Sequence, residues 1–284
     1  MIKIGFLGPK GTFTHEALRG YTKSRSEYVE CDFGTIADML VSVNNNEIDE
    51  AIVPIENSIE GGSIISNTLD MLAYEVDLKI KAEIVLKVAQ NLLVPEGVGL
   101  SDIECILSHP QALGQCRKYI DKHFPGIMLK ATQSTAGAAL EAARSGAKCA
   151  VIGSASLADV YGLKVLEHSI QDTDTNETRF IVVSKTDGER TGRDKSSIAF
   201  SMEEDKPGSL YRILNIFNLW DINMTRIESR PTRNKLGKYI FFVDLMGHRL
   251  DEDLRDALTM VKRKTSFYKF LGSYPMAGSR EITQ

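Results

Sequence analysis

The order of apolar and polar residues in the first 184 positions is the feature that most limits how this chain can fold. From Ile2 to Ser184, short runs rich in β-branched residues alternate with stretches of helical periodicity. This alternation is typical of an α/β domain with largely parallel strands. The expected strands are 2–7, 50–55, 103–108, 148–153 and 179–184, and the expected helices are 14–21, 63–75, 110–124 and 134–146.

This region is also large for a single sheet. We therefore expect two α/β lobes with a cleft between them. The chain is expected to cross from one lobe to the other near residues 75–85 and to return around 165–180. The two lobes together make a first domain at residues 1–184.

A second module follows a polar segment. Residues 185–196 contain glycine, lack apolar periodicity and are interpreted as a linker. The order of elements after it is β-α-β-β-α-β, the ferredoxin-like arrangement, over a domain at 197–276 with a tail at 277–284. The expected strands are 196–202, 222–229, 239–246 and 267–274, the helices are 208–220 and 251–264, and a turn lies at 234–238. Two helices on one sheet face should leave the other face and the edges available, so the module is expected to dimerise.

Composition limits the partners and the compartment. Charged residues make up 25% of the chain and the net charge is −4, which disfavours nucleic acid as a partner. No apolar run approaches the ~18 residues of a membrane span, and the N-terminal apolar stretch is too short for a signal peptide, so a cytoplasmic protein is expected. Cys31, Cys105, Cys116 and Cys149 lack CxxC spacing and are expected to be buried, reduced thiols, with no metal site.

Four strand-to-helix junctions carry hydroxyl, amide or glycine residues, at 8–14, 54–62, 108–111 and 133–137. In open α/β sheets the carboxyl ends of the strands form the ligand crevice, and helix N-termini there present unpaired N–H groups. The four junctions together favour a small anionic ligand. The 8–14 turn is neither GxGxxG nor a Walker loop, so nucleotide binding is not supported.

Several of these residues also have a purely structural explanation. Ser108 can cap the helix that follows it, with Gln111 completing a capping box, or it can contact a ligand. Thr12 or Thr14 can cap the first helix. Glu56 and Asn57 end a buried strand, where an apolar residue would be less costly, and this favours a functional role.

Residues 172–184, DTDTNETRFIVVS, place seven polar side chains before an arginine that begins an apolar strand. The alternatives are a surface turn with a solvated Arg179 and a binding site. Metal binding by Asp172, Asp174 and Glu177 is disfavoured because the EF-hand pattern is absent. No nucleophile elbow, HExxH motif or catalytic triad can be assembled. A site of this kind suits a reaction that is driven by the substrate itself.

Taken together, these turns resemble the prephenate dehydratase family, whose motifs occur here in order as FLGPKGTFTHEA, PIENSIEGG, SHPQALGQC, STAGAA and NETRF over residues 4–183. The C-terminal module resembles an ACT domain, through PGSLYRIL at 207–214 and IESRP at 227–231. Where the family commonly has GAL, this chain has Gly208, Ser209 and Leu210.

The resemblance implies an α/β fold with a two-lobed catalytic region, similar to periplasmic-binding-protein type II folds, plus a ferredoxin-like ACT domain. It implies conversion of prephenate to phenylpyruvate, water and carbon dioxide in phenylalanine biosynthesis, without a cofactor. Some related enzymes carry a chorismate mutase ahead of this region. Because the first strand begins at Ile2, we expect a single-activity enzyme.

The resemblance also assigns residues. Thr178 is expected to donate a hydrogen bond or proton to the departing hydroxyl, with the proton passed through Glu56, His109 or water, and Arg179 is expected to anchor a carboxylate. Phe180 is expected to pack beneath the cleft. The remaining expected substrate contacts are Thr12, Glu56, Asn57, Ser58, Ser108, His109, Gln111, Ser134, Thr135 and Asn176.

For regulation, the resemblance implies that phenylalanine binds at the interface of two ACT modules as an allosteric inhibitor. Feedback requires that phenylalanine bind one quaternary state better than another, so a homo-oligomer, dimer or tetramer, is expected. Glu228 and Arg230 have the alternative of a surface ion pair. The expected phenylalanine contacts are Pro207, Gly208, Ser209, Leu210, Asn223, Glu228, Ser229, Arg230 and Pro231.

Two other functions remain open from the sequence. Arogenate dehydratase performs the same elimination on the amino-acid analogue, and Glu56 could meet the ammonium group of arogenate. A cytosolic solute-binding regulator with an ACT sensor but no turnover is the alternative from another class. The hydroxyl of Thr178 argues against the regulator, because a pure binding protein does not need a donor at the position of the leaving group.

Overall fold

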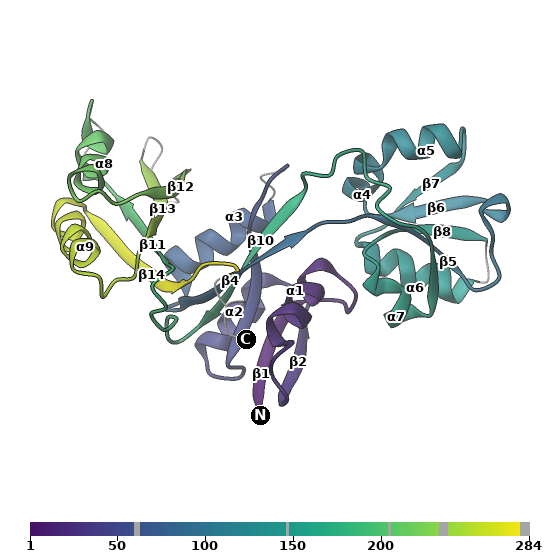
Figure 1. Cartoon of the computed structure of the whole chain (residues 1–284), viewed down its shortest axis with the longest axis horizontal. Helices are drawn as coiled ribbons and strands as arrows, with labels where there is room; N and C mark the ends of the chain where they lie inside the picture. Colours follow the sequence, from purple (N-terminus) through teal and green to yellow (C-terminus); the bar gives the residue numbers. More distant parts are fainter. Residues whose placement is uncertain (60–62, 146–147, 204–205, 233–237, 279–284) are drawn as a thin grey trace. The chain divides into compact units, whose positions relative to one another are not determined.

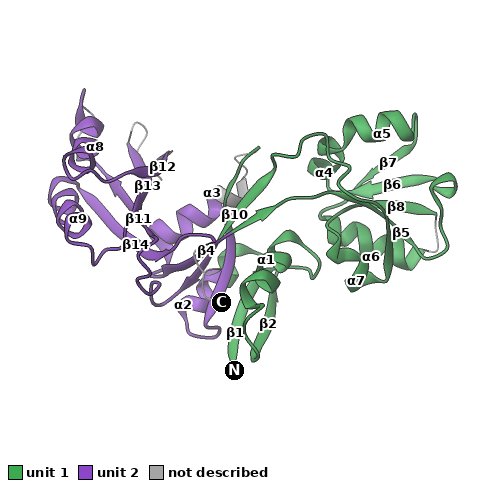
Figure 2. Ribbon diagram, viewed as in Figure 1, with its two compact units in different colours: residues 1–39, 54–62, 85–180 green, residues 40–53, 63–84, 181–284 purple. Residues whose placement is uncertain are grey.

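The computed structural model of the chain describes residues 1–59, 63–145, 148–203, 206–232 and 238–278. The chain divides into two compact units (Figure 2). Unit 1 contains residues 1–39, 54–62 and 85–180, and unit 2 contains residues 40–53, 63–84 and 181–284. Three strands, β3 (Glu50–Asn57), β4 (Lys79–Lys87) and β10 (Glu177–Ser184), have residues in both units.

The first sheet has five strands in the order β2-β1-β3-β10-β4. Strand β1 (Ile2–Leu7) pairs in parallel with β2 (Tyr28–Phe33). The helices of this part are α1 (Phe13–Thr22), α2 (Ile36–Asn44) and α3 (Ser63–Asp70), which continues into the π-helical turn η1 (Met71–Glu75). The sequence did not predict β2 and β4, because charged residues interrupt their apolar pattern.

The second sheet lies entirely in unit 1, with the order β7-β6-β8-β5-β9. The chain enters it after Lys87 and leaves it after Glu167. Strand β6 is parallel to β7 and β8, whereas β5 is antiparallel to β8 and β9. The strands are β5 (Asn91–Pro95), β6 (Cys105–Ser108), β7 (Met128–Ala131), β8 (Cys149–Gly153) and β9 (Leu163–Glu167), with a 3₁₀ turn η2 at Leu100–Asp102. The two sheets agree with the expectation of two α/β lobes.

Helices cover both faces of the second sheet (Figure 1). Ile106 and Ile152 pack with α4 (Pro110–Gln115) and α5 (Arg117–His123). Their neighbours Leu107 and Val151 pack on the opposite face with α6 (Thr135–Ser145) and α7 (Ser156–Tyr161), as the alternation of side chains along a strand requires. The expected single helix at 110–124 is two helices, because the chain leaves helical geometry at Cys116.

The third sheet has the strand order β12-β13-β11-β14, with antiparallel neighbours. Helices α8 (Ser209–Leu219) and α9 (Glu252–Lys264) pack on one face around Phe200, Val243 and Leu258. The strands are β11 (Asp194–Ser201), β12 (Met224–Pro231), β13 (Tyr239–Met246) and β14 (Phe267–Pro275). This confirms the ferredoxin-like module, although most of the expected turn at 234–238 lies outside the described residues.

The other face of the third sheet is not available, contrary to expectation. Ile240 and Phe242 on that face are each 1% exposed. Lys269 of β14 donates to the carbonyl oxygen of Val76 at 2.6 Å, at the end of η1, and burial lowers the pKa of Lys269. A side chain at Gly272 would clash with the backbone of Ile80. Within unit 2, the ACT-type sheet is therefore packed against the segment that runs from α3 to β4.

The cysteines also differ from expectation. Cys105 and Cys149 are register partners on the parallel strands β6 and β8, and a disulfide joins them. Cys116 is a buried thiol, and burial raises its pKa to about 12. The expectation of four reduced thiols is thus wrong for the pair. Among the described residues, no helix is long and apolar enough to cross a membrane.

Candidate active site

The end of β3 and the start of β10 are joined in unit 1 by hydrogen bonds centred on Asn57. Its Nδ2 donates to Thr178 Oγ1 and to Asn176 Oδ1, both at 2.9 Å. Its Oδ1 accepts from the backbone N–H of Ile59 at 3.0 Å. Because that N–H can only donate, the amide group is oriented with its NH₂ toward Thr178. The Thr178 hydroxyl therefore accepts from Asn57 and keeps its own proton as a donor.

Ser58 fastens the same two chain segments through its side chain. The Ser58 hydroxyl donates to the carbonyl oxygen of Thr175 at 2.7 Å and accepts from the N–H of Glu177 at 2.9 Å. The Ser58 N–H also donates to the carbonyl oxygen of Glu177. These bonds fix the backbone on either side of Asn176, so Ser58 has a positional role here.

Arg179 follows Thr178 along β10 and is buried, with 8% of its surface exposed. Its Nη1 lies 3.1 Å from Glu56 Oε2, and the Glu56 side chain is 48% exposed. A buried guanidinium needs a counter-charge, and Glu56 supplies one. Phe180, the next residue, is 2% exposed and belongs to the core.

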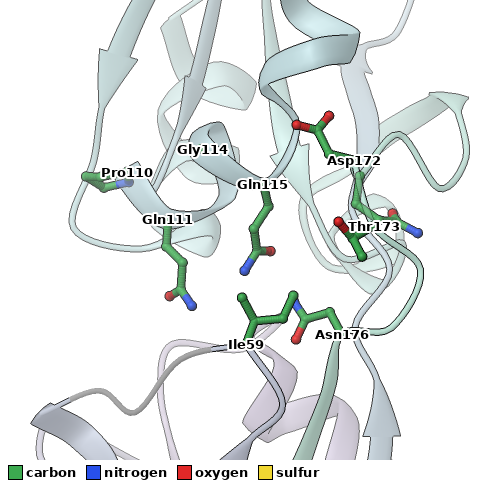
Figure 3. A pocket seen from close by; sticks show the side chains of 9 residues that line it. Ile59, Pro110, Gln111, Gly114, Gln115, Asp172, Thr173 and Asn176 are labelled. Carbon is green, nitrogen blue, oxygen red and sulfur yellow. The ribbon is translucent and has the colours of Figure 1, made fainter.

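A cavity of about 410 Å³ adjoins this network within unit 1. Gln111 and Gln115 project from α4 toward Ile59 and Asn176 (Figure 3). The volume of the cavity lies in the usual range for small-molecule sites. The residues that line it are Ile59, Pro110, Gln111, Gly114, Gln115, Gln171, Asp172, Thr173 and Asn176.

Two of the expected contacts, Gln111 and Asn176, line this cavity, and the hydrogen bonds of Asn57 connect it to Thr178. The sequence analysis missed Gln115, Gln171 and Thr173. Gln115 could have been found, because it lies four residues after Gln111 and so shares its helix face.

Ser108 and His109 have local roles that differ from the expected capping box. Ser108 ends β6, is fully buried and donates to the carbonyl oxygen of Ile152 at 2.5 Å. His109 is the residue that caps α4, since its Nδ1 accepts from the N–H of Gln111 at 3.3 Å. Of the two alternatives for Ser108, capping of this helix is therefore wrong.

Thr12 and Ser134, two further hydroxyl residues of the junctions, bond to the first turns of their helices. Thr12 caps α1 by accepting from the N–H of His15, and it donates to the carbonyl oxygen of Leu7. Ser134 precedes α6 and accepts from the N–H of Gly137 at 2.9 Å. Thr135 begins α6 and is half-buried. None of these three is among the residues that line the cavity described above.

A buried histidine supports the turn that precedes α1. His15 Nδ1 accepts from the N–H of Gly11 at 3.1 Å, and its Nε2 lies 3.3 Å from Glu30 Oε2. Burial lowers the pKa of His15, although the hydrogen bond to Glu30 opposes this. For Glu30, burial alone would raise the pKa, but hydrogen bonds from Lys10 and His15 outweigh it and the pKa is lowered. Because Nδ1 accepts the N–H of Gly11, the ring proton lies on Nε2, facing Glu30.

In the ACT-type module, the expected ligand residues lie on two elements. Gly208 caps α8 with φ +83°, a left-handed conformation that glycine adopts without strain, and Pro207, Ser209 and Leu210 flank it. Asn223 precedes β12, which carries Glu228, Ser229, Arg230 and Pro231. Arg230 is bonded through Nε and Nη2 to both carboxylate oxygens of Asp70 in α3, at 3.0 and 3.2 Å. Glu228 pairs with Arg226.

Side-chain amides line much of the cavity, and Asp172 is the only ionisable side chain among the described residues that line it. Both oxygens of Asp172 accept from the N–H of Lys118, at 3.0 and 3.2 Å. In the described part of the chain, no cluster of His, Cys, Asp or Glu is arranged to hold a metal ion. The arrangement suits a reaction that needs orientation and one positioned hydroxyl donor rather than a strong acid or base.

Comparison with known proteins supports the family resemblance noted in the sequence. The prephenate dehydratase family profile matches residues 4–188, and the ACT domain profile matches residues 196–259. A bifunctional chorismate mutase/prephenate dehydratase from Aquifex aeolicus is 43% identical over 97% of this chain and 74% of its own length. A prephenate dehydratase from Methanocaldococcus jannaschii is 41% identical over 94% of this chain and 96% of its own length.

A solved structure adds agreement in three dimensions. The prephenate dehydratase of Arthrobacter aurescens, in complex with L-Phe, is 38% identical, has a TM-score of 0.88 and covers 98% of this chain and 91% of its own. Such similarity over nearly the whole length includes both the α/β region and the ACT module. The chain therefore belongs to the prephenate dehydratase family.

Proposed function

We propose that the chain eliminates water and carbon dioxide from prephenate at the cavity beside the start of β10, with Thr178 as the donor to the departing hydroxyl. The observation that carries this proposal is the hydrogen bond from Asn57 Nδ2 to Thr178 Oγ1. It orients the threonine hydroxyl while leaving its proton available. The family assignment supports the reaction, and the hydrogen bonds of Asn57 support the proposed role of Thr178.

The reaction makes modest demands on the protein. The C–C bond to the ring carboxylate breaks, its electron pair enters the ring, and the ring C–O bond breaks so that hydroxide leaves with a proton as water. Aromatisation drives these steps. The protein must hold the carboxylates so that one can depart, and must stabilise the charge that develops on the leaving oxygen.

A threonine hydroxyl is a weak acid, so Thr178 acts mainly as an oriented hydrogen-bond donor and the net proton comes from solvent. Arg179, the next residue along β10, is proposed to anchor a carboxylate, and Glu56 moderates its charge. The side-chain amides of Gln111 and Gln115 offer neutral donors inside the cavity. These groups suit a substrate that enters with two negative charges and leaves with one.

The ACT module serves as the sensor for L-phenylalanine in this proposal. The Arthrobacter aurescens relative has been solved with L-Phe, which supports the same ligand here. The proposed contacts are the 207–210 turn, Asn223 and the 228–231 segment. Arg230 reaches from that segment to Asp70, so ligand binding at β12 has a direct route to α3. The protein is further proposed to be a cytoplasmic homo-oligomer, dimer or tetramer, with ACT modules at an interface.

The test is an assay of purified protein that follows the absorbance of phenylpyruvate, with prephenate and arogenate in parallel. Thr178→Ala should lower kcat by about 10²-fold and leave KM nearly unchanged, whereas Thr178→Ser should retain much more activity. Near-normal turnover of Thr178→Ala would remove that residue from the mechanism. Turnover of arogenate alone would replace the proposed substrate.

The sensor is tested separately in the same assay. Added L-phenylalanine should suppress turnover of prephenate by the wild type. Arg230→Ala should be less inhibited, with basal turnover retained. Turnover without suppression would leave the catalytic proposal standing and reject the sensor proposal.

A further inference from the structure

A buried glutamine outside the cavity lining is bonded to one of the cavity residues. Gln90 lies between β4 and β5 and is 3% exposed. Its Nε2 donates to Gln115 Oε1 at 3.1 Å. Because this bond occupies Gln115 Oε1, the NH₂ of the same amide group is directed elsewhere. Figure 3 shows the Gln115 nitrogen pointing into the cavity, toward Ile59 and Gln111.

The segment that carries Gln90 is held by hydrogen bonds to residues 170–176, some of which line the cavity. The Gln90 N–H donates to Gln171 Oε1 at 2.9 Å, and its carbonyl oxygen accepts from the N–H of Ile170 at 2.8 Å. Two residues earlier, the N–H of Val88 donates to the carbonyl oxygen of Asn176 at 2.8 Å. These bonds fix the backbone at Gln90, so the side chain that donates to Gln115 starts from a fixed position.

The side-chain oxygen of Gln90 does not help to explain why a glutamine occupies this position. Gln90 Oε1 is buried and has no hydrogen-bond partner among the residues that the structure describes. Burying an acceptor without a partner is unfavourable, and an apolar side chain of similar size would avoid that penalty. A glutamine at this position is therefore best explained by what its NH₂ does.

We propose that Gln90 is a positioning residue for the elimination, which holds the Gln115 amide with its N–H groups facing the substrate. The inference rests on the proposed function, since it assumes that the cavity binds prephenate. With this orientation the cavity presents donors to a dianionic substrate. With the opposite orientation it would present the Gln115 carbonyl oxygen, which repels a carboxylate.

Gln90→Met tests the proposal, because methionine has a similar size and no donor. Its kcat/KM for prephenate should fall by about 10-fold, while the midpoint of thermal unfolding should stay the same or rise. Gln115→Met should lower kcat/KM at least as much. The double variant should match Gln115→Met alone, because Gln90 acts only through Gln115.

Gln90→Glu gives a second readout in the pH profile. A protonated carboxyl at this position can donate to Gln115 Oε1 as the amide does, whereas the ionised form can only accept and would turn the Gln115 amide around. Activity of Gln90→Glu relative to wild type should therefore rise as the pH is lowered. In the Gln115→Met background this gain at low pH should disappear.

The outcomes separate this proposal from the proposed function. If wild type turns over prephenate and Gln90→Met does so equally well, or if the losses of the two methionine variants multiply, the positioning role is overturned and the proposed function stands. If Gln90→Met is poorly folded, a flat relative pH profile of Gln90→Glu overturns it instead. A wild type that does not turn over prephenate overturns both.

Discussion

Asn57→Asp is the substitution that tests the hydrogen-bond network most directly, because it replaces one NH₂ group by an oxygen with almost no change in shape. In the native network, Asn57 donates to Thr178 Oγ1 and to Asn176 Oδ1, each at 2.9 Å. A carboxylate can only accept. The Thr178 hydroxyl would then donate its proton to the new carboxylate, and that proton would no longer face the leaving group.

The size of the effect follows from the new hydrogen bond between the Thr178 hydroxyl and the introduced carboxylate. This bond must break before the hydroxyl can donate to the substrate. A hydrogen bond from a hydroxyl to a charged acceptor contributes about 1.5–3 kcal/mol, and 1.36 kcal/mol corresponds to a factor of ten in rate. This gives a loss in kcat of roughly 10- to 150-fold. Asn57 is half-buried, so solvent weakens the new bond and the lower part of that range is expected.

The assay compares kcat and KM for prephenate in Asn57→Asp, in Thr178→Ala and in the double variant. In the double variant, the aspartate should add little to the loss, because the hydroxyl that it captures is absent. Asn45→Asp, at an exposed asparagine in unit 2, introduces the same charge as a control and should behave as wild type. An Asn57→Asp enzyme within twofold of wild type would refute the reasoning. So would an equal fractional loss in both backgrounds.

Two further predictions concern parts of the molecule outside the cavity. Because burial lowers the pKa of His15, the unfolded chain binds more protons than the folded chain near and below the ordinary pKa of about 6.5, so stability should decrease as the pH falls from 7 to 5.5. In thermal unfolding, His15→Asn should show a shallower decrease over that range, and an unchanged slope would contradict the role of His15. Asp70→Asn removes the carboxylate bound by Arg230 and should raise the concentration of L-phenylalanine needed for half inhibition, on the order of 5-fold, with basal kcat unchanged. Inhibition identical to wild type would show that this ion pair does not couple the sensor to α3.

The packing of the ACT sheet gives that last prediction its physical basis. The face opposite α8 and α9 would be free to bind another partner in an isolated ferredoxin-like module. Here Arg230 bonds to Asp70 and Lys269 bonds to the carbonyl oxygen of Val76, so this face is fixed to the α3–β4 segment. In the proposed sensor, a ligand that shifts the position of β12 would therefore also shift α3 through the existing Arg230–Asp70 bond.

Much of the fold could be predicted because its signals are local. The expected strand at 239–246 has the bounds of β13, and the expected helix at 251–264 differs from α9 by one residue. Apolar periodicity and turn residues determine such elements within a few residues of sequence. The motifs that resemble prephenate dehydratase also lie within short segments, and they pointed to Asn57, Gln111, Asn176 and Thr178 before any geometry was known.

The errors and omissions have a common cause. Ser108 follows the pattern of a helix cap, yet its hydroxyl bonds to Ile152, 44 positions away. Cys105 and Cys149 are also separated by 44 positions and meet only because β6 and β8 pair in register. A capping rule or a cysteine spacing contains no information about which strands become neighbours.

The sequence by itself therefore determined many of the elements, the two kinds of domain and the family, since each depends on residues close together along the chain. Only the tertiary structure decided how the site is supported. Gln90 holds Gln115 from 25 positions away, and Arg230 reaches Asp70 across 160. Such pairs form because the sheets bring distant segments to hydrogen-bonding distance, and the geometry of those bonds decides which way an amide or hydroxyl proton points.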